Sequence, residues 1–168
     1  MIGLRVLGID CGSIQTGVAI LQSNGKDHQV LHFGAIRVPR SRALGERLRH
    51  IHHELEGLLE RFHPDSIALE AVFQAFNVKS AMHLSQVRGV VPLLAAQAKL
   101  PVSEYSALAV KKSVVGYGRA EKHQVQQMVQ RALALPAPPQ PEDAADALAV
   151  ALCHIHNETT RRRQAGMR

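Results

Sequence analysis

The chain has 168 residues, a length typical of one domain that buries an apolar core without disulfide or metal staples. Hydrophobic residues make up 46% of it but aromatic residues only 4%, so the core must consist mainly of aliphatic side chains, a composition that favours helices packed on a sheet. Twenty Lys and Arg against 14 Asp and Glu give a net charge of +6, which is compatible with a polyanionic partner but equally with a solvated basic surface.

The sequence lacks the patterns of a membrane span, a signal peptide and a zinc module. No apolar run reaches the roughly 18 residues of a membrane span, and the N-terminus has no signal-peptide pattern, so we expect a cytoplasmic protein without a membrane segment. Cys11 and Cys153 have no zinc-module spacing and are predicted to be reduced and partly buried. The pairs His52-His53 and His154-x-His156 lack further ligands at suitable spacing and are expected on helix surfaces.

The N-terminal part of the chain predicts three antiparallel strands. Two aliphatic runs within residues 4–21 flank a Gly-Ser-Thr turn and indicate a hairpin, with Asp10 where the first run ends. A polar turn over residues 23–27 and an alternating run over 30–38 add the third strand, which Pro39 stops. Alone, Asp10 is compatible with a turn cap, a phosphate-binding loop or a metal ligand.

Helices and strands alternate in the remainder of the chain. Apolar residues at helical spacing predict an amphipathic helix over 44–62, and an apolar run ending on Glu70 predicts a buried parallel strand. The further expected elements are a helix over 77–99 weakened by Gly89 and Pro92, a strand over 101–105, and helices over 120–133 and 142–156. Between the strand and these helices lie residues 107–114, with Lys111-Lys112, and a glycine-rich loop over 116–119 that has basic residues on both sides. This order predicts one α/β domain over 1–157 with a mixed sheet, compatible with a ribonuclease H-like architecture, and a basic, disordered tail over 158–168.

Four carboxylates stand at the ends of predicted elements or on an apolar helix: Asp10, Glu70, Asp143 and Asp146. If the strands that end at Asp10 and Glu70 are neighbours, both acids lie on one edge of the sheet. Residues 143 and 146 share a helix face, because they are three apart, and that face is expected to pack toward the sheet. Acids in the first turn of a helix also favour its positive end, which is the structural alternative for Asp143.

Four converging carboxylates would repel one another and have raised pKa values unless cations compensate them. Oxygen ligands suit Mg²⁺ or Mn²⁺, and a pair of such ions about 4 Å apart serves phosphodiester hydrolysis. The sequence therefore predicts a metal-dependent nuclease site.

Over residues 7 to about 156 the chain resembles the RuvC family of Holliday-junction endonucleases. The matching stretches are Gly8-Ile9-Asp10-x-Gly12-Ser13-x-x-Thr16-Gly17, Glu70-x-Val72-Phe73 followed by Asn77, Gln86-x-Arg88-Gly89, Val110-Lys111-x-x-Val114-x-Gly116-x-Gly118-x-Ala120-x-Lys122-x-Gln124-Val125, and Asp143-Ala144-Ala145-Asp146-Ala147-Leu148-Ala149. The resemblance implies a ribonuclease H-like fold with a five-stranded mixed sheet, a homodimer, and symmetric cutting of two like-polarity strands of a four-way DNA junction to leave 5′-phosphate and 3′-hydroxyl ends. It also implies the RuvA–RuvB branch-migration complex as a partner.

By the same resemblance the four acids hold two Mg²⁺ ions, which Mn²⁺ can replace, Lys111 and Lys122 contact DNA, and Phe73 stacks on a base. Stacking suits the strained bases of a junction, because an aromatic ring accepts any base; the alternative is that Phe73 belongs to the core. Further basic residues are candidate DNA contacts or solvated charges: Lys79, Arg88, Lys112 and Arg119. The chain departs from the family pattern at Cys11, where proline is usual, and at Phe76, where lysine is common before Asn77.

Other functions remain as alternatives. A RuvX/YqgF-like nuclease acting on RNA shares the opening turn, but the Asp-Ala-Ala-Asp block and the spacing of Glu70 and Phe73 favour RuvC. An actin-like or sugar-kinase-like ATP-binding protein also opens with strand-Asp-x-Gly-strand, but it needs a second domain for which 168 residues leave no room. A non-catalytic junction-binding module would be expected to have lost at least one of the acids.

Overall fold

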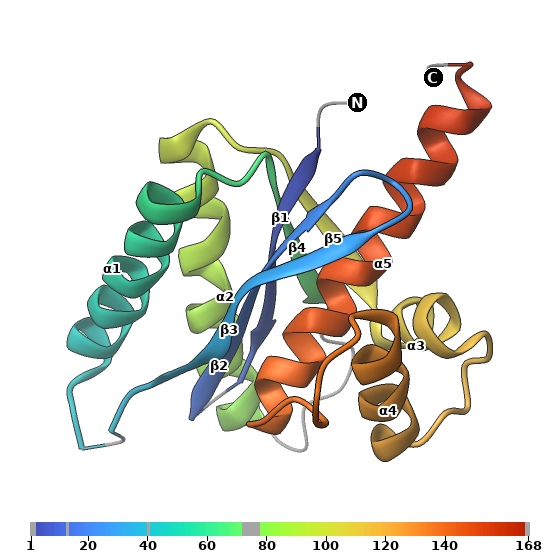
Figure 1. Ribbon diagram of the computed structural model, residues 1–168. Helices are drawn as coiled ribbons and strands as arrows, with labels where there is room; N and C mark the ends of the chain where they lie inside the picture. Colours follow the sequence, from blue (N-terminus) through green and yellow to red (C-terminus); the bar gives the residue numbers. More distant parts are fainter. Residues whose placement is uncertain (1–2, 13, 40, 72–77, 167–168) are drawn as a thin grey trace.

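A single five-stranded sheet forms the middle layer of the computed structural model, which describes residues 3–12, 14–39, 41–71 and 78–166, with the backbone alone at 79 and 80. The sheet order is β3-β2-β1-β4-β5 (Figure 1). The strands are β1 (Leu4–Cys11), β2 (Gln15–Ser23), β3 (His28–Arg37), β4 (Ser66–Ala71) and β5 (Val102–Ser106). The first three pair antiparallel, and β4 and β5 join them parallel, so the predicted mixed five-stranded sheet is confirmed.

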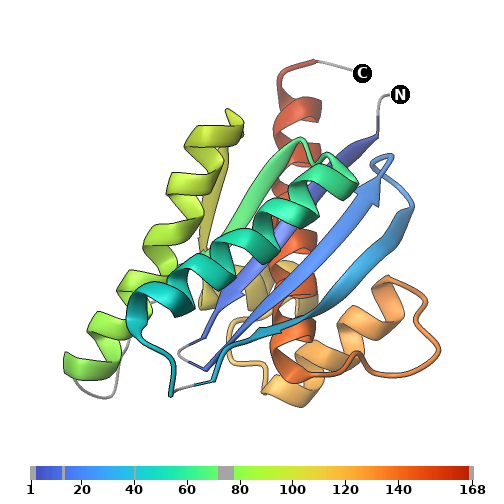
Figure 2. The ribbon, with the colours of Figure 1, turned by 90° about the vertical axis from the view of Figure 1, so that its left-hand side faces the viewer.

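Helices cover both faces of the sheet. They are α1 (Leu44–Phe62), α2 (Val78–Ala98), α3 (Ala107–Val115), α4 (Lys122–Ala132) and α5 (Glu142–Gln164). On one face α1 and α2 pack over side chains such as Leu7 and Ile9, and on the other α3, α4 and α5 pack over Val6 and Ala19. Figure 2 shows α1 in front of the sheet and α5 behind it. The period-two alternation of β1 thus supplies both cores.

Helix α5 crosses the sheet at unusually short range because glycines face it. A Cβ added to Gly8 of β1 would lie 2.3 Å from the main-chain oxygen of Ala147, and one added to Gly17 of β2 would lie 1.9 Å from that of Asp143. On the helix side the contact is made by small residues, with Ala144, Ala147 and Ala151 fully buried. Small residues on both sides therefore set how closely the first turns of α5 approach β1 and β2.

Two details differ from the sequence-based expectations. Helix α5 continues to Gln164, so residues 158–164, expected to be disordered, are helical; Glu158 pairs with Arg161 one turn on at 2.8 Å, and the arginines at 161–163 favour the negative end of the helix. The predicted helix that contains Gly89 and Pro92 is confirmed as α2, and Pro92 lies on its exposed face.

The second difference concerns His154, which the sequence predicts on a helix surface but which is only 3% exposed. Its ring nitrogens lie 2.9 Å from the hydroxyls of Ser66 and Tyr105, so α5 is hydrogen-bonded to β4 and β5 through one buried imidazole. Across the described ranges no helix combines the length and the hydropathy needed to cross a membrane.

Candidate active site

Asp10 and Glu70 lie on one edge of the sheet, as predicted. Strands β1 and β4 are adjacent and parallel, and their register pairs Ile9 with Leu69, so the next residue of each strand is an acid. The side chains of Ile9 and Leu69 are buried in the core, and the alternation of the strands turns Asp10 and Glu70 to the opposite face. That face is the one covered by α3, α4 and α5.

The other two acids reach this edge from the start of α5. The main-chain oxygen of Asp143 lies against Gly17, and Gly17 is the cross-strand partner of Asp10. Asp146 follows one turn later, and its charge acts on both Asp10 and Glu70. All four acids predicted from the sequence are therefore brought together at the junction of β1, β4 and α5.

Burial and neighbouring acids raise the pKa values of three of these carboxylates, those of Asp10, Glu70 and Asp146. Burial, and then the charges of Glu70, Asp146 and Asp143, raise the pKa of Asp10 to about 8. Burial and the charge of Asp146 also raise the pKa of Glu70, and burial raises that of Asp146 although its hydrogen bond with Lys122 opposes the shift. A partly buried cluster of carboxylates with raised pKa values requires added positive charge if all its members are to be ionised.

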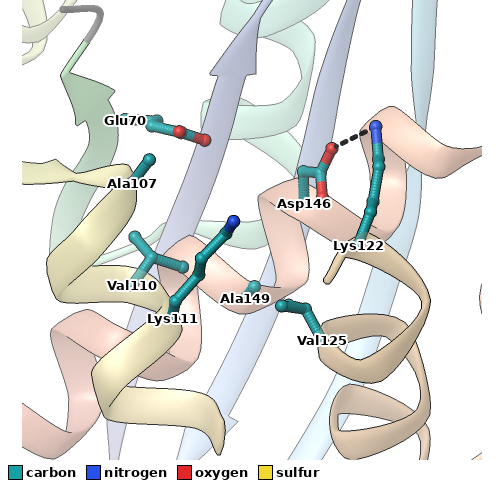
Figure 3. Close-up of a pocket in the computed structure, with 8 residues that line it drawn as sticks. All are labelled: Glu70, Ala107, Val110, Lys111, Lys122, Val125, Asp146 and Ala149. Atoms are coloured by element: carbon teal, nitrogen blue, oxygen red, sulfur yellow. Dashed lines mark ion pairs between the residues drawn. The ribbon is translucent and has the colours of Figure 1, made fainter. Parts of the chain in front are cut away.

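Lys122, the first residue of α4, supplies part of that charge. Its Nζ lies 3.0 Å from an oxygen of Asp146 (Figure 3). The same nitrogen lies 3.1 Å from an oxygen of Glu142. Burial lowers the pKa of Lys122, but the hydrogen bonds and charges of Asp146 and Glu142 outweigh it and raise the pKa above its usual value. Lys122 therefore stays protonated beside the acidic cluster.

A pocket of about 180 Å³ opens between the acids and the two predicted DNA-contacting lysines. Its lining residues are Glu70, Ala107, Val110, Lys111, Lys122, Val125, Asp146 and Ala149. Lys111 extends from α3 toward the space between Glu70 and Asp146 (Figure 3), and its charge lowers the pKa of Glu70. The pocket therefore carries carboxylates and ammonium groups close to one another, with Lys122 paired to Asp146.

The donor atoms of the cluster fit a hard divalent cation, because they are carboxylate oxygens beside an open pocket. Within the described part of the chain, however, no three Asp, Glu, His or Cys side chains stand close enough to hold a metal ion as they are placed. Asp146 is paired with Lys122 instead. A cation would have to draw the carboxylates together.

The other basic residues predicted as candidate DNA contacts have different surroundings. The guanidinium of Arg88 donates to the main-chain oxygen of Glu70 and to the carboxylate of Glu104 at 3.0 Å, so it ties α2 to β4 and β5. Lys112 and Arg119 are exposed, on α3 and in the loop before α4. Phe73 lies outside the described residues, as does the side chain of Lys79.

Gln15 and Arg37 belong to the site but were not singled out by the sequence. The amide nitrogen of Gln15 donates to Oδ2 of Asp143, and Nε of Arg37 donates to the amide oxygen of Gln15 at 3.2 Å. The two are cross-strand partners in β2 and β3. The predicted strands could indicate that Gln15 lies opposite Arg37. No local sequence pattern, however, connects position 15 with position 143.

Cys11, next to Asp10, is 5% exposed. Burial, and then the charge of Asp10, raise the pKa of its thiol to about 12. The cysteine that replaces the usual proline is therefore a protonated core residue at neutral pH, with the low reactivity of a buried thiol.

Comparison with known proteins places these features in one family. The model of the family "Crossover junction endodeoxyribonuclease RuvC" matches residues 6–154. A RuvC crossover junction endodeoxyribonuclease of Koribacter versatilis is 48% identical over 160 residues, covering 94% of this chain and 95% of the relative. One of Syntrophomonas wolfei is 46% identical over 154 residues, covering 92% and 90%.

The structural comparison agrees. The structure of Thermus thermophilus RuvC in complex with a Holliday junction substrate superposes with a TM-score of 0.90 at 30% identity, covering 94% of this chain and 96% of that one. This match confirms the ribonuclease H-like fold predicted from the sequence.

Proposed function

Because the chain belongs to the family of RuvC crossover junction endodeoxyribonucleases, we propose that it resolves Holliday junctions in DNA recombination and repair by metal-dependent hydrolysis of phosphodiester bonds. The observation that carries the proposal is the convergence of four carboxylates from β1, β4 and α5 beside a pocket lined by Lys111 and Lys122. The products are two symmetrically placed nicks, each with a 5′-phosphate and a 3′-hydroxyl. The proposed substrate is chromosomal DNA, so we expect the protein to act in the cytoplasm.

The acids are proposed as the metal ligands: Asp10, Glu70, Asp143 and Asp146. Two Mg²⁺ ions held there, or Mn²⁺ in their place, would activate the attacking water and stabilise the leaving 3′ oxygen. Asp10 is the most central of the four, since the charges of the other three all act on it. Because burial and the other acids raise the pKa of Asp10, a bound cation would favour its ionised form.

The lysines are proposed to hold the DNA strand against the acids. Lys111 and Lys122 enter the pocket from separate helices, so one phosphate can meet an ammonium group from each side. Lys122 pairs with Asp146 in the free protein, and we propose that it turns to the phosphate when cations and DNA bind. Lys112 and Arg119, which are exposed on α3 and in the loop before α4, are proposed as further DNA contacts. Phe73 is proposed to stack on a base of the junction.

A homodimer is proposed because a four-way junction is cut at two symmetric positions and each subunit has one acidic cluster. Helix α2 supplies a suitable face: Met82 and Leu93 are 59% and 56% exposed, and Gly89 and Pro92 lie exposed between them. From Ala81 to Ala98, Arg88 is the one Lys, Arg, Asp or Glu in the sequence, and its guanidinium is engaged with Glu70 and Glu104. We also propose, on the family relationship, that the dimer acts with a RuvA–RuvB branch-migration complex.

The decisive experiment incubates the purified protein and Mg²⁺ with a synthetic four-way junction, with linear duplex and RNA in parallel. We expect paired nicks on strands of like polarity in the junction alone, and none with Asp143→Asn. Equal cutting of the linear duplex would contradict junction selectivity, and preferential cutting of RNA would favour the RuvX/YqgF-like activity. Junction binding without cleavage at any Mg²⁺ or Mn²⁺ concentration would indicate a non-catalytic binding module.

A further inference from the structure

The two acids of α5 are held in different ways. Asp146 pairs with the ammonium of Lys122, whereas Asp143 accepts a hydrogen bond from the neutral amide of Gln15. An amide donor stabilises an ionised carboxylate without adding a full positive charge that would repel a cation. Oδ2 of Asp143 is thereby occupied, and the other oxygen, Oδ1, faces Gly12, where an added Cβ would lie 3.9 Å from it.

The orientation of the Gln15 amide is set by Arg37. A guanidinium has only donors, so it must meet the oxygen of the amide, and the N–H₂ end is then left to face Asp143. The backbone fixes this arrangement, because Gln15 and Arg37 are directly opposite in the β2–β3 ladder. The start of β2 in turn lies beneath the first turn of α5, where Gly17 meets Asp143.

We propose that Gln15 is a positioning residue that holds the Asp143 carboxylate for divalent-cation binding, and that Arg37 orients the Gln15 amide for this role. The inference rests on the proposed function, since it takes Asp143 as a metal ligand. Groups that hydrogen-bond to ligating carboxylates typically change metal affinity or activity by about 10–100-fold when they are removed. An effect near the lower end of that range is expected, because three further acids remain.

The chain contains a matched control on the same strand. At the other end of β2, Gln22 accepts hydrogen bonds from Arg5 at 2.7 and 3.2 Å, and these two residues are also cross-strand partners. The variants Gln15→Leu and Gln22→Leu each remove one amide from a Gln–Arg pair of β2. Only the first removes a contact with the acidic cluster.

The test measures Mn²⁺ binding to the DNA-free protein from the electron paramagnetic resonance signal of free Mn²⁺. We expect the dissociation constant to rise about tenfold for Gln15→Leu, less for Arg37→Met, and not for Gln22→Leu. The Mg²⁺ concentration for half-maximal junction cleavage should rise in the same order, with the rate of Gln15→Leu restored at high Mg²⁺. Junction affinity in EDTA should equal that of the wild type.

Equal Mn²⁺ affinities of the wild type, Gln15→Leu and Gln22→Leu would overturn the inference, as would a loss of affinity of the same size in both Leu variants. If Gln15→Leu fails to fold, Arg37→Met decides alone, and wild-type Mn²⁺ affinity in that variant overturns the role of Arg37. Failure of the proposed function is a separate result: the wild type would then leave four-way junctions uncut at saturating Mg²⁺.

Discussion

Gly17 lies directly beneath Asp143, so close that a Cβ at position 17 would stand 1.9 Å from the Asp143 main-chain oxygen. Because the obstacle is helix backbone, Gly17→Ala must move the first turn of α5. We expect a loss of about 1–3 kcal/mol in the free energy of unfolding, typical of overpacking. We expect a fall of about 10²-fold in cleavage, since a catalytic group is misplaced by of the order of 1 Å.

Gly57→Ala is the control for this substitution. Gly57 is an exposed residue of α1 with no neighbour within 4 Å of an added Cβ. Alanine should stabilise the helix there by roughly 0.5–1 kcal/mol and leave cleavage unchanged. Urea denaturation and junction cleavage of both variants check the pair, and wild-type stability and cleavage in Gly17→Ala would contradict the close approach.

Asp10→Asn is expected to increase the stability of the metal-free protein and to abolish cleavage. The raised pKa of Asp10, about 8, means that its ionised form is unfavourable in the metal-free fold. A neutral amide of the same shape should increase the free energy of unfolding by about 1 kcal/mol or more at pH 8.5 without metal, while cleavage is lost. Thermal denaturation in EDTA, beside a cleavage assay, measures both; a less stable variant would show that Asp10 is not under electrostatic strain.

Lys111 and Lys122 should each contribute to the salt dependence of junction binding. Each phosphate contact contributes about 0.9 to the slope of log affinity against log salt concentration on B-DNA. Lys111→Met and Lys122→Met should each reduce the slope by about that amount. Lys26→Met, in the exposed turn between β2 and β3, should leave it unchanged. If all three variants have the same slope, Lys111 and Lys122 do not contact DNA phosphates.

Stability should fall in mild acid because of buried imidazoles. Burial lowers the pKa of His154 below its ordinary value of 6.5, so the folded state binds fewer protons than the unfolded state in that range. The contribution to stability is therefore complete above about pH 6.5 and is lost as the pH falls, by at most about 1.4 kcal/mol per pH unit. His154→Gln should flatten this dependence between pH 7 and pH 5 in urea denaturation, and an unchanged curve would exclude His154 as a source.

The sequence predicts the sheet and the acids well because both follow from local patterns. Aliphatic runs on either side of a turn identify β1 and β2, and an alternating run identifies β3. The acids at the ends of β1 and β4 need only the adjacency of these two strands to meet. The hydrogen bond between Gln15 and Asp143 joins residues 128 positions apart and depends on the crossing of α5 over Gly17. Such a contact requires the packed structure.

Other differences have similar causes. The burial of His154 was missed because a polar side chain in an apolar helix is satisfied by Ser66 and Tyr105, which are distant in sequence. The helical residues 158–164 have a polar, arginine-rich composition that is also typical of disorder. Their helix is continuous with the buried part of α5, so it does not need to nucleate on its own.

The two cysteines make the native protein its own reporter of structural opening. Cys11 lies at the acidic edge of the sheet and Cys153 in the middle of α5, and both thiols are buried. A thiol reagent can reach either sulfur only when the surrounding segment separates from its neighbours, so the labelling rate of each cysteine measures a local opening equilibrium. Comparing the two rates with and without divalent cation would therefore give the energy that the cation adds at the end of β1 relative to the body of α5, without any engineered probe.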